Sequence, residues 1–248
     1  MKITAISDLH GLLPKDLPGG DVLCICGDIV PLEYQNDSYQ SVAWFDLEFV
    51  PWTDSIPYKK VIIVAGNHDF FIETLHKRLT NIPEVDGFSE FRWRSPSDVL
   101  KRLLPGTNKS KHKLVYLCDN SVEIEGKVFY GTPYIANLKR WAFYRDNEDL
   151  KSLYAKIPKK CDVLLTHMPP RVLGMGEVLQ GGNFNTGANY GSEELAEAIA
   201  QRNIKYALCG HVHSGCHQPQ ELNGTTYANV SIKDENYKES YYPFEFEL

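Results

Sequence analysis

Five short apolar runs in this chain each end in side chains that bind metal ions well, and this pattern constrains the fold most. The runs are ITAIS (3–7), DVLCIC (21–26), VIIVA (61–65), DVLLT (162–166) and YALC (206–209). Continuous apolar runs of this length, rich in β-branched residues, predict strands that are buried on both faces. Strands of that kind belong to α/β proteins, in which helices cover the sheet.

The residues directly after the five runs carry polar side chains. They are Asp8 and His10; Asp28; Asn67, His68 and Asp69; His167; and His211 and His213. In open α/β sheets, ligands bind outside the carboxyl ends of the strands. We therefore expect these side chains to meet at one rim, where they can form a two-metal site. A lone histidine such as His10 would more often be a buried core residue, but the clustering of five histidines at run ends favours metal binding.

Segments with helical patterns alternate with the apolar runs. Capping residues and helix breakers predict helices from Asp37 or Ser38 to about Val50, over 70–79 and 97–104, from Asp146 or Asn147 to Ile157, and over 193–202 after Ser192. Further strands are expected over 114–117, 122–124, 127–130 and 225–230, with a hairpin turn at Glu125-Gly126.

Two long stretches, 83–113 and 171–191, fit no regular element. Long loops inside a compact domain are usually functional or mobile. Neither stretch has the composition of a linker, and no second hydrophobic core flanks them. We therefore expect a single domain over residues 1–248.

Composition excludes several classes of protein. A hydrophobic fraction of 43% and a charged fraction of 23% are typical of globular proteins. The net charge of −6 argues against an extended nucleic-acid footprint, although it permits a small phosphate ester. The six cysteines form no C-x-x-C pair, which favours buried thiols over a zinc ribbon. Without a secretory signal or an apolar run of membrane-spanning length, we expect a cytoplasmic protein.

The seven candidate ligands also indicate which reaction and which metal ions the site suits. Two divalent ions about 3.5–4 Å apart can clamp the attacking and leaving oxygens of a phosphoryl transfer. Of the seven candidate ligands, only Asp8 and Asp28 are anionic, so two divalent ions leave an excess of about two positive charges, which suits a phosphate. The mixture of imidazole and oxygen donors suits manganese, iron, zinc, cobalt or nickel.

The series D-x-H (8–10), G-D (27–28), G-N-H-D (66–69), H (167) and G-H-x-H (210–213) resembles the calcineurin-like metallophosphoesterases. The resemblance implies a four-layer α-β-β-α sandwich. It implies that the first metal is held by Asp8, His10, Asp28 and His213, and the second by Asp28, Asn67, His167 and His211. It also implies phosphoester hydrolysis by a hydroxide that bridges the two metals. His68 would then assist the leaving group, and Asp69 would orient the His68 ring.

Other motifs are similar to a narrower branch, the small metallophosphoesterase-domain proteins, which act as phosphodiesterases, notably on cyclic nucleotides. These motifs are LTHMPP (165–170), YLCD (116–119), GTPY (131–134) and WAF (141–143). The resemblance places Tyr134, Trp141 and Phe143 near the site, where Tyr134 and Trp141 are candidate substrate contacts because aromatic faces can stack a nucleobase. Core packing of Trp141 and Phe143 is an equal alternative. Some branch members carry glycine where His211 stands, so its presence here favours an occupied second metal site.

The favoured function is thus hydrolysis of small or cyclic-nucleotide-like phosphodiesters. The main alternative is a phosphomonoesterase or phosphoprotein phosphatase. A scaffold that has lost catalysis is less favoured, because His68 and every ligand position are intact. A nuclease is also less favoured, because the chain is acidic and shows no basic, aromatic-lined groove. The expected partner is a small phosphoester rather than a membrane, and the oligomeric state stays open.

Overall fold

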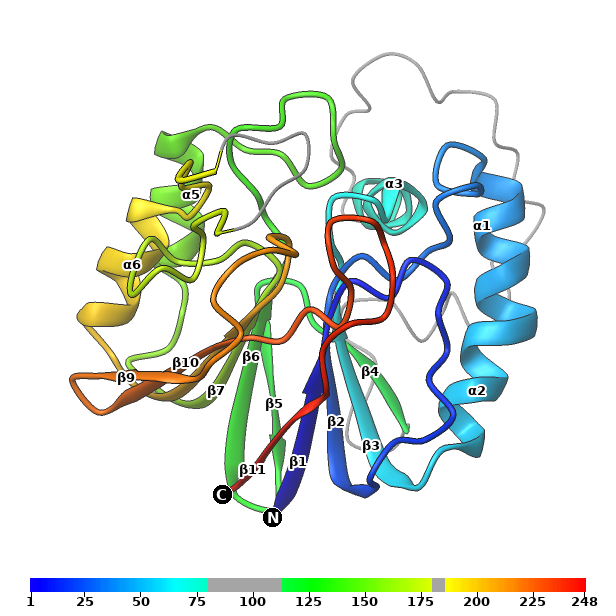
Figure 1. Ribbon diagram of the computed structural model, residues 1–248, viewed down its shortest axis with the longest axis horizontal. Coiled ribbons are helices and arrows are strands. Elements are labelled where there is room, and N and C mark those ends of the chain that lie inside the picture. The colour runs from blue at the N-terminus through cyan, green and yellow to red at the C-terminus, as the bar shows by residue number, and fades with distance from the viewer. Residues whose placement is uncertain (80–112, 180–185) are drawn as a thin grey trace.

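The computed structural model describes residues 1–79, 113–179 and 186–248. Two β-sheets lie face to face, and helices cover the outer side of each sheet (Figure 1). This is the four-layer α-β-β-α sandwich that the resemblance implied. In the described part of the chain, no helix is long and apolar enough to cross a membrane.

The first sheet has the strand order β11-β1-β2-β3-β4. Its strands span Phe244–Glu247, Lys2–Ile6, Gly20–Cys26, Tyr58–Val64 and Leu114–Tyr116. Strands β1 to β4 run parallel, and β11 pairs with β1 in the antiparallel sense at the edge. The last strand thus brings the two ends of the chain together, and the Met1 amino group donates to the Leu248 carbonyl at 2.8 Å.

The second sheet has the strand order β5-β6-β7-β8-β10-β9. Its strands span Asn120–Ile124, Lys127–Thr132, Lys160–Thr166, Asn203–Cys209, Thr225–Asn229 and Gln220–Leu222. The four central strands are parallel, and β5 and β9 are antiparallel edge strands. The expected β5–β6 hairpin is present, with positive φ at Glu125 (49°) and Gly126 (75°), as two-residue hairpin turns require.

Both faces of the central strands are buried, which explains why the sequence runs are continuously apolar. In β2, Val22, Cys24 and Cys26 belong to the core between the two sheets. The alternate residues Leu23 and Ile25 belong to the core beneath the helices. The expectation of buried thiols is met, since Cys24 and Cys26 are fully buried and unpaired.

The helices begin where the sequence predicts, at side-chain caps. The outer layers contain α1 (Ser38–Trp44), the π-helical turn η1 (Phe45–Phe49), α2 (Val50–Ser55), α3 (Phe70–Leu79), α5 (Asn147–Tyr154) and α6 (Glu193–Ala200). The carboxylates of Asp37 and Asp146 and the hydroxyl of Ser192 accept hydrogen bonds from the first backbone amides of α1, α5 and α6.

Several helix ends differ from the sequence prediction. The first helical segment continues beyond Val50 to Ser55, because Pro51 lies in the first turn of α2 and follows a π-helical turn, where its missing N–H is tolerated. Helix α5 ends at Tyr154, and residues up to Ile157 form tighter turns. Helix α6 ends at Ala200, two residues before its expected end. The helix expected over 97–104 lies outside the described residues.

Parallel strand order gives the site its position. The loops after β1, β2, β3, β7 and β8 gather at the end of the sandwich opposite the two termini (Figure 1). Strand β2 packs across the sheet interface against β7, so loops from both sheets meet there. The rim predicted from the five run ends is therefore one place in the molecule.

Candidate metal centre

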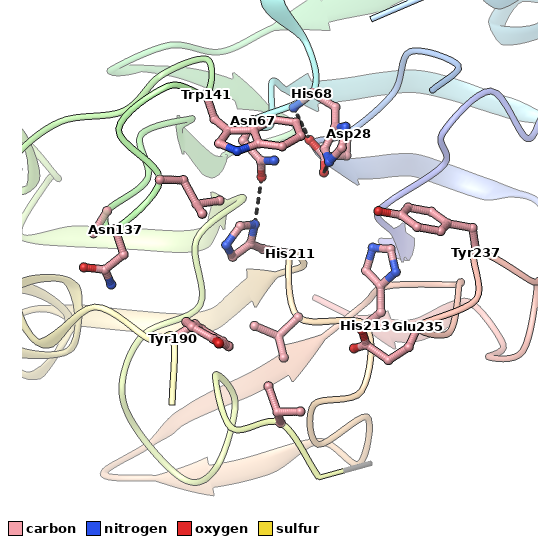
Figure 2. A pocket seen from close by; sticks show the side chains of 14 residues that line it. Asp28, Asn67, His68, Asn137, Trp141, Tyr190, His211, His213, Glu235 and Tyr237 are labelled. Atoms are coloured by element: carbon pink, nitrogen blue, oxygen red, sulfur yellow. Dashed lines mark hydrogen bonds and ion pairs between the residues drawn. The ribbon is translucent and has the colours of Figure 1, made fainter. Parts of the chain in front are cut away.

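The structure brings all seven candidate ligands together at the rim (Figure 2 shows several of them). Three groups of donors have ligand atoms within 4.8 Å of one another: Asp8, His10 and His213; His10, Asp28 and His68; and Asp8, Asp28 and His167. Asn67 and His211 join through contacts to His167 described below. Asp8, His10 and Asp28 each belong to two of these groups, so the three groups form one continuous cluster of donors.

The hydrogen bonds of His167 show that its site fits a cation. Its Nδ1 lies 2.8 Å from the Cys26 carbonyl, which can only accept, so Nδ1 carries the proton. In a neutral ring, Nε2 then presents a lone pair. That lone pair faces the Asn67 Oδ1 at 2.9 Å and the Asp28 Oδ2 at 3.3 Å. Lone pairs that converge in this way call for a positive charge between them.

The second sheet presents His211 to the same point. The His211 Nδ1 lies 2.8 Å from the Asn67 Oδ1 and 3.2 Å from the His167 Nε2 (Figure 2). One amide oxygen and two imidazole nitrogens therefore face one another within hydrogen-bond distance. This donor mixture is one that transition metals prefer.

The other side of the rim repeats the pattern. The His213 Nδ1 donates to the Asp234 carbonyl at 3.0 Å, which turns Nε2 toward the Asp8 Oδ1 at 3.4 Å. Both ring nitrogens of His10 are buried and have no hydrogen-bond partner among the described residues. A buried polar atom without a partner is costly, and a metal ligand role would account for it. The residues present thus fit two divalent ions.

Electrostatics at the rim hold Asp28, His10 and His211 in the protonation states of metal ligands, whereas His167 is held protonated. Burial alone would raise the pKa of Asp28, but the imidazoles of His167 and His68 reverse this and hold it well below its usual value. Burial lowers the pKa of His10 and of His211 to about 3, so both rings are neutral near pH 7. Although burial opposes it, the Asp28 and Asp8 carboxylates raise the pKa of His167 to about 9, so its Nε2 carries a proton at neutral pH, and a bound cation would take the place of that proton.

The backbone at the rim is held in an uncommon conformation. Asp8, His10, Asp28 and His211 have positive φ values of 58°, 42°, 52° and 72°. Left-handed backbone is unfavourable for residues with a Cβ, and such strain clusters at functional sites. A glycine provides the space that this backbone needs, because a Cβ on Gly66 would overlap the Asp28 carboxylate.

His68 faces the cavity through one ring nitrogen and holds a partner through the other. Its Nε2 lies 3.8 Å from the Asp28 Oδ2, and its backbone N–H donates to the Asp28 Oδ1 at 2.8 Å. Its Nδ1 makes a short contact with the Gln35 Oε1. The ring also packs against His10 and Trp141, with centroid distances of 4.7 and 4.4 Å. His68 is thereby fixed with Nε2 on the side of the Asp28 carboxylate.

The expectation that Asp69 orients the His68 ring is not met. The Asp69 carboxylate is fully buried and accepts hydrogen bonds from the backbone amides of Gly66, Ile29 and Val30 at 2.8–3.0 Å. These bonds tie the loop after β2 to the loop after β3, so Asp69 stabilises the rim backbone. Gln35 contacts His68 in its place, and no motif around Gln35 signals this from the sequence.

A half-open cavity of about 300 Å³ lies over the rim. Its wall combines apolar and aromatic side chains with few charges. Besides rim residues, the lining consists of Ala136, Asn137, Leu138, Trp141, Val178, Tyr190, Val212, Glu235 and Tyr237. No lysine or arginine of the described residues lines it, and Glu235 is the one charged side chain outside the rim.

Of the two candidate substrate contacts, only one lines the cavity. Trp141 lines the cavity as expected. Tyr134 does not line it: the side chain is 5% exposed and packs against Phe143, with the Arg145 guanidinium 4.8 Å from its ring centroid. Phe143 is fully buried, as the core-packing alternative proposed. The residues that sequence reasoning missed are Gln35, Tyr190, Glu235 and Tyr237, of which only Tyr190 lies in a stretch already singled out as a long loop.

Comparison with known proteins agrees with this geometry. A family model described as calcineurin-like phosphoesterase matches residues 1–215. A UPF0046 protein of Caenorhabditis elegans is 30% identical over 257 residues, which cover 100% of this chain and 81% of that protein. Metallophosphoesterase domain-containing protein 1 of Homo sapiens is 26% identical over 246 residues, which cover 96% of this chain and 68% of that protein.

A solved structure gives the same fold. The phosphopantetheinyl hydrolase of Mycobacterium tuberculosis matches with a TM-score of 0.53 and 16% identity, covering 95% of this chain and 90% of that one. At this identity the likeness concerns the fold alone. The family model, however, spans every rim motif from Asp8 to His213. The chain therefore belongs to the calcineurin-like phosphoesterase family and is a metal-dependent phosphoester hydrolase.

Proposed function

We propose that this hydrolase cleaves small phosphodiesters, including cyclic-nucleotide-like ones. The observation that carries the proposal is the charge of the cavity wall, which has Glu235 and no lysine or arginine among the described lining residues. A phosphomonoester approaches two negative charges at neutral pH, and proteins usually hold such groups with arginine. A phosphodiester carries one negative charge and a second, uncharged ester group. That group fits the apolar part of the wall formed by Leu138, Trp141 and Val178.

The size and aromatic character of the cavity support a small substrate with a planar group. A volume of about 300 Å³ is at the lower end for small-molecule sites. Trp141, Tyr190 and Tyr237 surround the cavity from three sides (Figure 2). Aromatic faces of this kind can stack a nucleobase.

The rim residues would hold two divalent transition metals, with manganese, iron, zinc, cobalt and nickel all suited to the donors. We assign Asp8, His10, Asp28 and His213 to the first ion, and Asp28, Asn67, His167 and His211 to the second. When bound, the ions supply charge stabilisation to the phosphate and a nucleophile from water. The deep burial of the rim residues strengthens these electrostatic interactions.

His68 would transfer the proton that the leaving alcohol needs. The Gln35 carbonyl oxygen can only accept, so the contact favours a proton on Nδ1 of His68. Because burial lowers the pKa of His68, Nε2, the nitrogen near Asp28 and the cavity, would first take up the proton that the attacking water releases and then give it to the departing oxygen. Protonation of the departing oxygen by a positioned imidazole contributes about 10²–10⁴-fold to rate.

The unpaired state of all six cysteines agrees with a reducing compartment such as the cytoplasm.

A substrate panel tests the proposed function. Protein loaded with manganese, iron or zinc is assayed with bis-para-nitrophenyl phosphate, para-nitrophenyl phosphate, cyclic nucleotides and a phosphopeptide. We expect kcat/KM for the diester to exceed that for the matched monoester by about tenfold or more, equivalent to roughly 1.4 kcal/mol. Faster cleavage of the monoester or the phosphopeptide would favour a phosphatase. No turnover with any metal would contradict hydrolysis itself.

A further inference from the structure

Tyr237 belongs to a short hairpin that covers one side of the rim. The hairpin spans 233–239, where Lys233 and Glu239 form an antiparallel bridge, and it lies beyond the region matched by the family model. The Tyr237 ring packs edge-on against His10 and His213, at centroid distances of 4.9 and 5.2 Å and interplanar angles of 80° and 84°. This hairpin therefore places an aromatic side chain directly on the first metal group.

The hairpin holds Tyr237 in a conformation that tyrosine rarely adopts. The Tyr237 φ is 58°, in the left-handed region. Asp234 fixes the turn, because its carboxylate accepts from the backbone amides of Asn236 and Lys238 and from the Ser240 hydroxyl at 2.8–3.0 Å. The Asp234 carbonyl also accepts a hydrogen bond from the Tyr237 N–H at 2.9 Å. Backbone strain that the surrounding structure enforces is characteristic of functional residues.

The Tyr237 hydroxyl points into the cavity. In Figure 2 the ring reaches from the side of His213 toward Asp28, with its oxygen foremost. The hydroxyl has no hydrogen-bond partner among the described residues, and the residue is 42% exposed. A phenol is protonated at neutral pH and can donate one hydrogen bond. An unused donor thus faces the space above the metal ligands.

We propose that the Tyr237 hydroxyl donates a hydrogen bond to a phosphoryl oxygen of the substrate held at the rim. The inference rests on the proposed function and adds a phosphate contact that the sequence motifs do not contain. A neutral donor replaces the cationic side chain that the described wall lacks. It suits a monoanionic diester better than a dianionic monoester, because it adds no positive charge beside Glu235.

The substitution Tyr237→Phe removes the hydroxyl and keeps both ring contacts. Tyr242→Phe is the matched control, since Tyr242 is 95% exposed and does not line the cavity. Three quantities are measured on manganese-loaded protein: bound metal, the dissociation constant of inorganic phosphate by calorimetry, and kcat/KM for bis-para-nitrophenyl phosphate. We expect wild-type metal content, with phosphate affinity and kcat/KM each lowered about tenfold or more, as for hydrogen bonds to charged groups.

Two results would overturn the proposal. Phosphate affinity and kcat/KM within twofold of wild type would show that the hydroxyl makes no substrate contact. A loss of bound metal would show that Tyr237 supports His10 and His213 instead. If wild-type protein cleaves no diester, the proposed function fails, while the phosphate-binding measurement still decides the role of Tyr237.

Discussion

The metal rim and the cavity wall of this protein are built in different ways. Rim side chains follow β1, β2, β3, β7 and β8 directly, so the sheets fix their positions. Apart from Val212, the wall comes from three irregular segments, 136–141, 178–190 and 233–239, which carry turns and isolated bridges instead of strands in their described parts. The difference separates chemistry, which needs fixed geometry, from selectivity, which side chains on loops can change without disturbing the sheets.

Asp28→Asn should have the largest effect, because it removes the charge of the carboxylate that we assign to both metal ions. The asparagine oxygen can still accept the His68 N–H, so the fold should be retained. We expect loss of at least one metal equivalent and a drop of about 10³-fold or more in kcat for every substrate. Metal analysis and activity assays measure this, with the exposed Asp54→Asn as control. Two tightly bound metal equivalents in Asp28→Asn would contradict the assignment of Asp28 to both ions.

Gln35→Ala should have an intermediate effect, because it frees His68 without touching the metals. We expect kcat to fall about tenfold for a diester with an alkyl leaving group, and less for a nitrophenyl ester, whose leaving group needs no proton. KM and metal content should stay near wild type. Gln35→Glu, which retains an acceptor oxygen, should restore most of the rate, and exposed Asn36→Ala is the matched control.

The double variant shows whether Gln35 acts through His68. We expect His68→Ala to lower the rate for the alkyl ester by about 10²-fold or more while metal stays bound. Adding Gln35→Ala to that background should cost little further activity. A full multiplicative loss in the double variant would show that Gln35 acts elsewhere.

Glu235→Gln should have the smallest effect and should change selectivity alone. The Glu235 Oε1 accepts the Ser214 N–H at 2.8 Å, and glutamine can keep this bond. Loss of the negative charge should raise kcat/KM for the monoester relative to the diester by about two- to fivefold, as expected of a partly exposed charge. The ratio is measured with the two nitrophenyl esters, against exposed Glu221→Gln. An equal change in kcat/KM for both esters would show that Glu235 acts on the reaction, as the rim residues do, and not on selectivity.

Much of the rim was predictable because it depends on local pattern. Each ligand motif directly follows an apolar run, and parallel strands carry their carboxyl ends to one edge. The assignment of Asp69 failed because sequence proximity to His68 says nothing about where a carboxylate points. Asp69 turns toward the backbone of Ile29 and Val30, which are 40 and 39 residues away in the chain.

Edge elements were also missed, although one of them left a signal. The alternation Phe-Glu-Phe-Glu at 244–247 is that of a half-buried strand, and β11 forms there at the sheet edge. Strand β9 is three residues long and carries no such alternation. Tyr134 was misplaced for another reason: it shares a segment with residues of the site, but its side chain is buried and packs against Phe143.

The sequence by itself determined the buried strands and the polar motifs that follow them, because strand periodicity and strand-end motifs are local properties. The resemblance carried by those motifs then implied the family, the two-sheet architecture and the candidate metal ligands. Tertiary structure decided which partner holds His68 and which side chains form the wall. Gln35 and His68 are 33 residues apart, and Tyr237 reaches His10 from the opposite end of the chain. Such contacts depend on how loops fold over a finished sandwich, and no spacing within one segment encodes them.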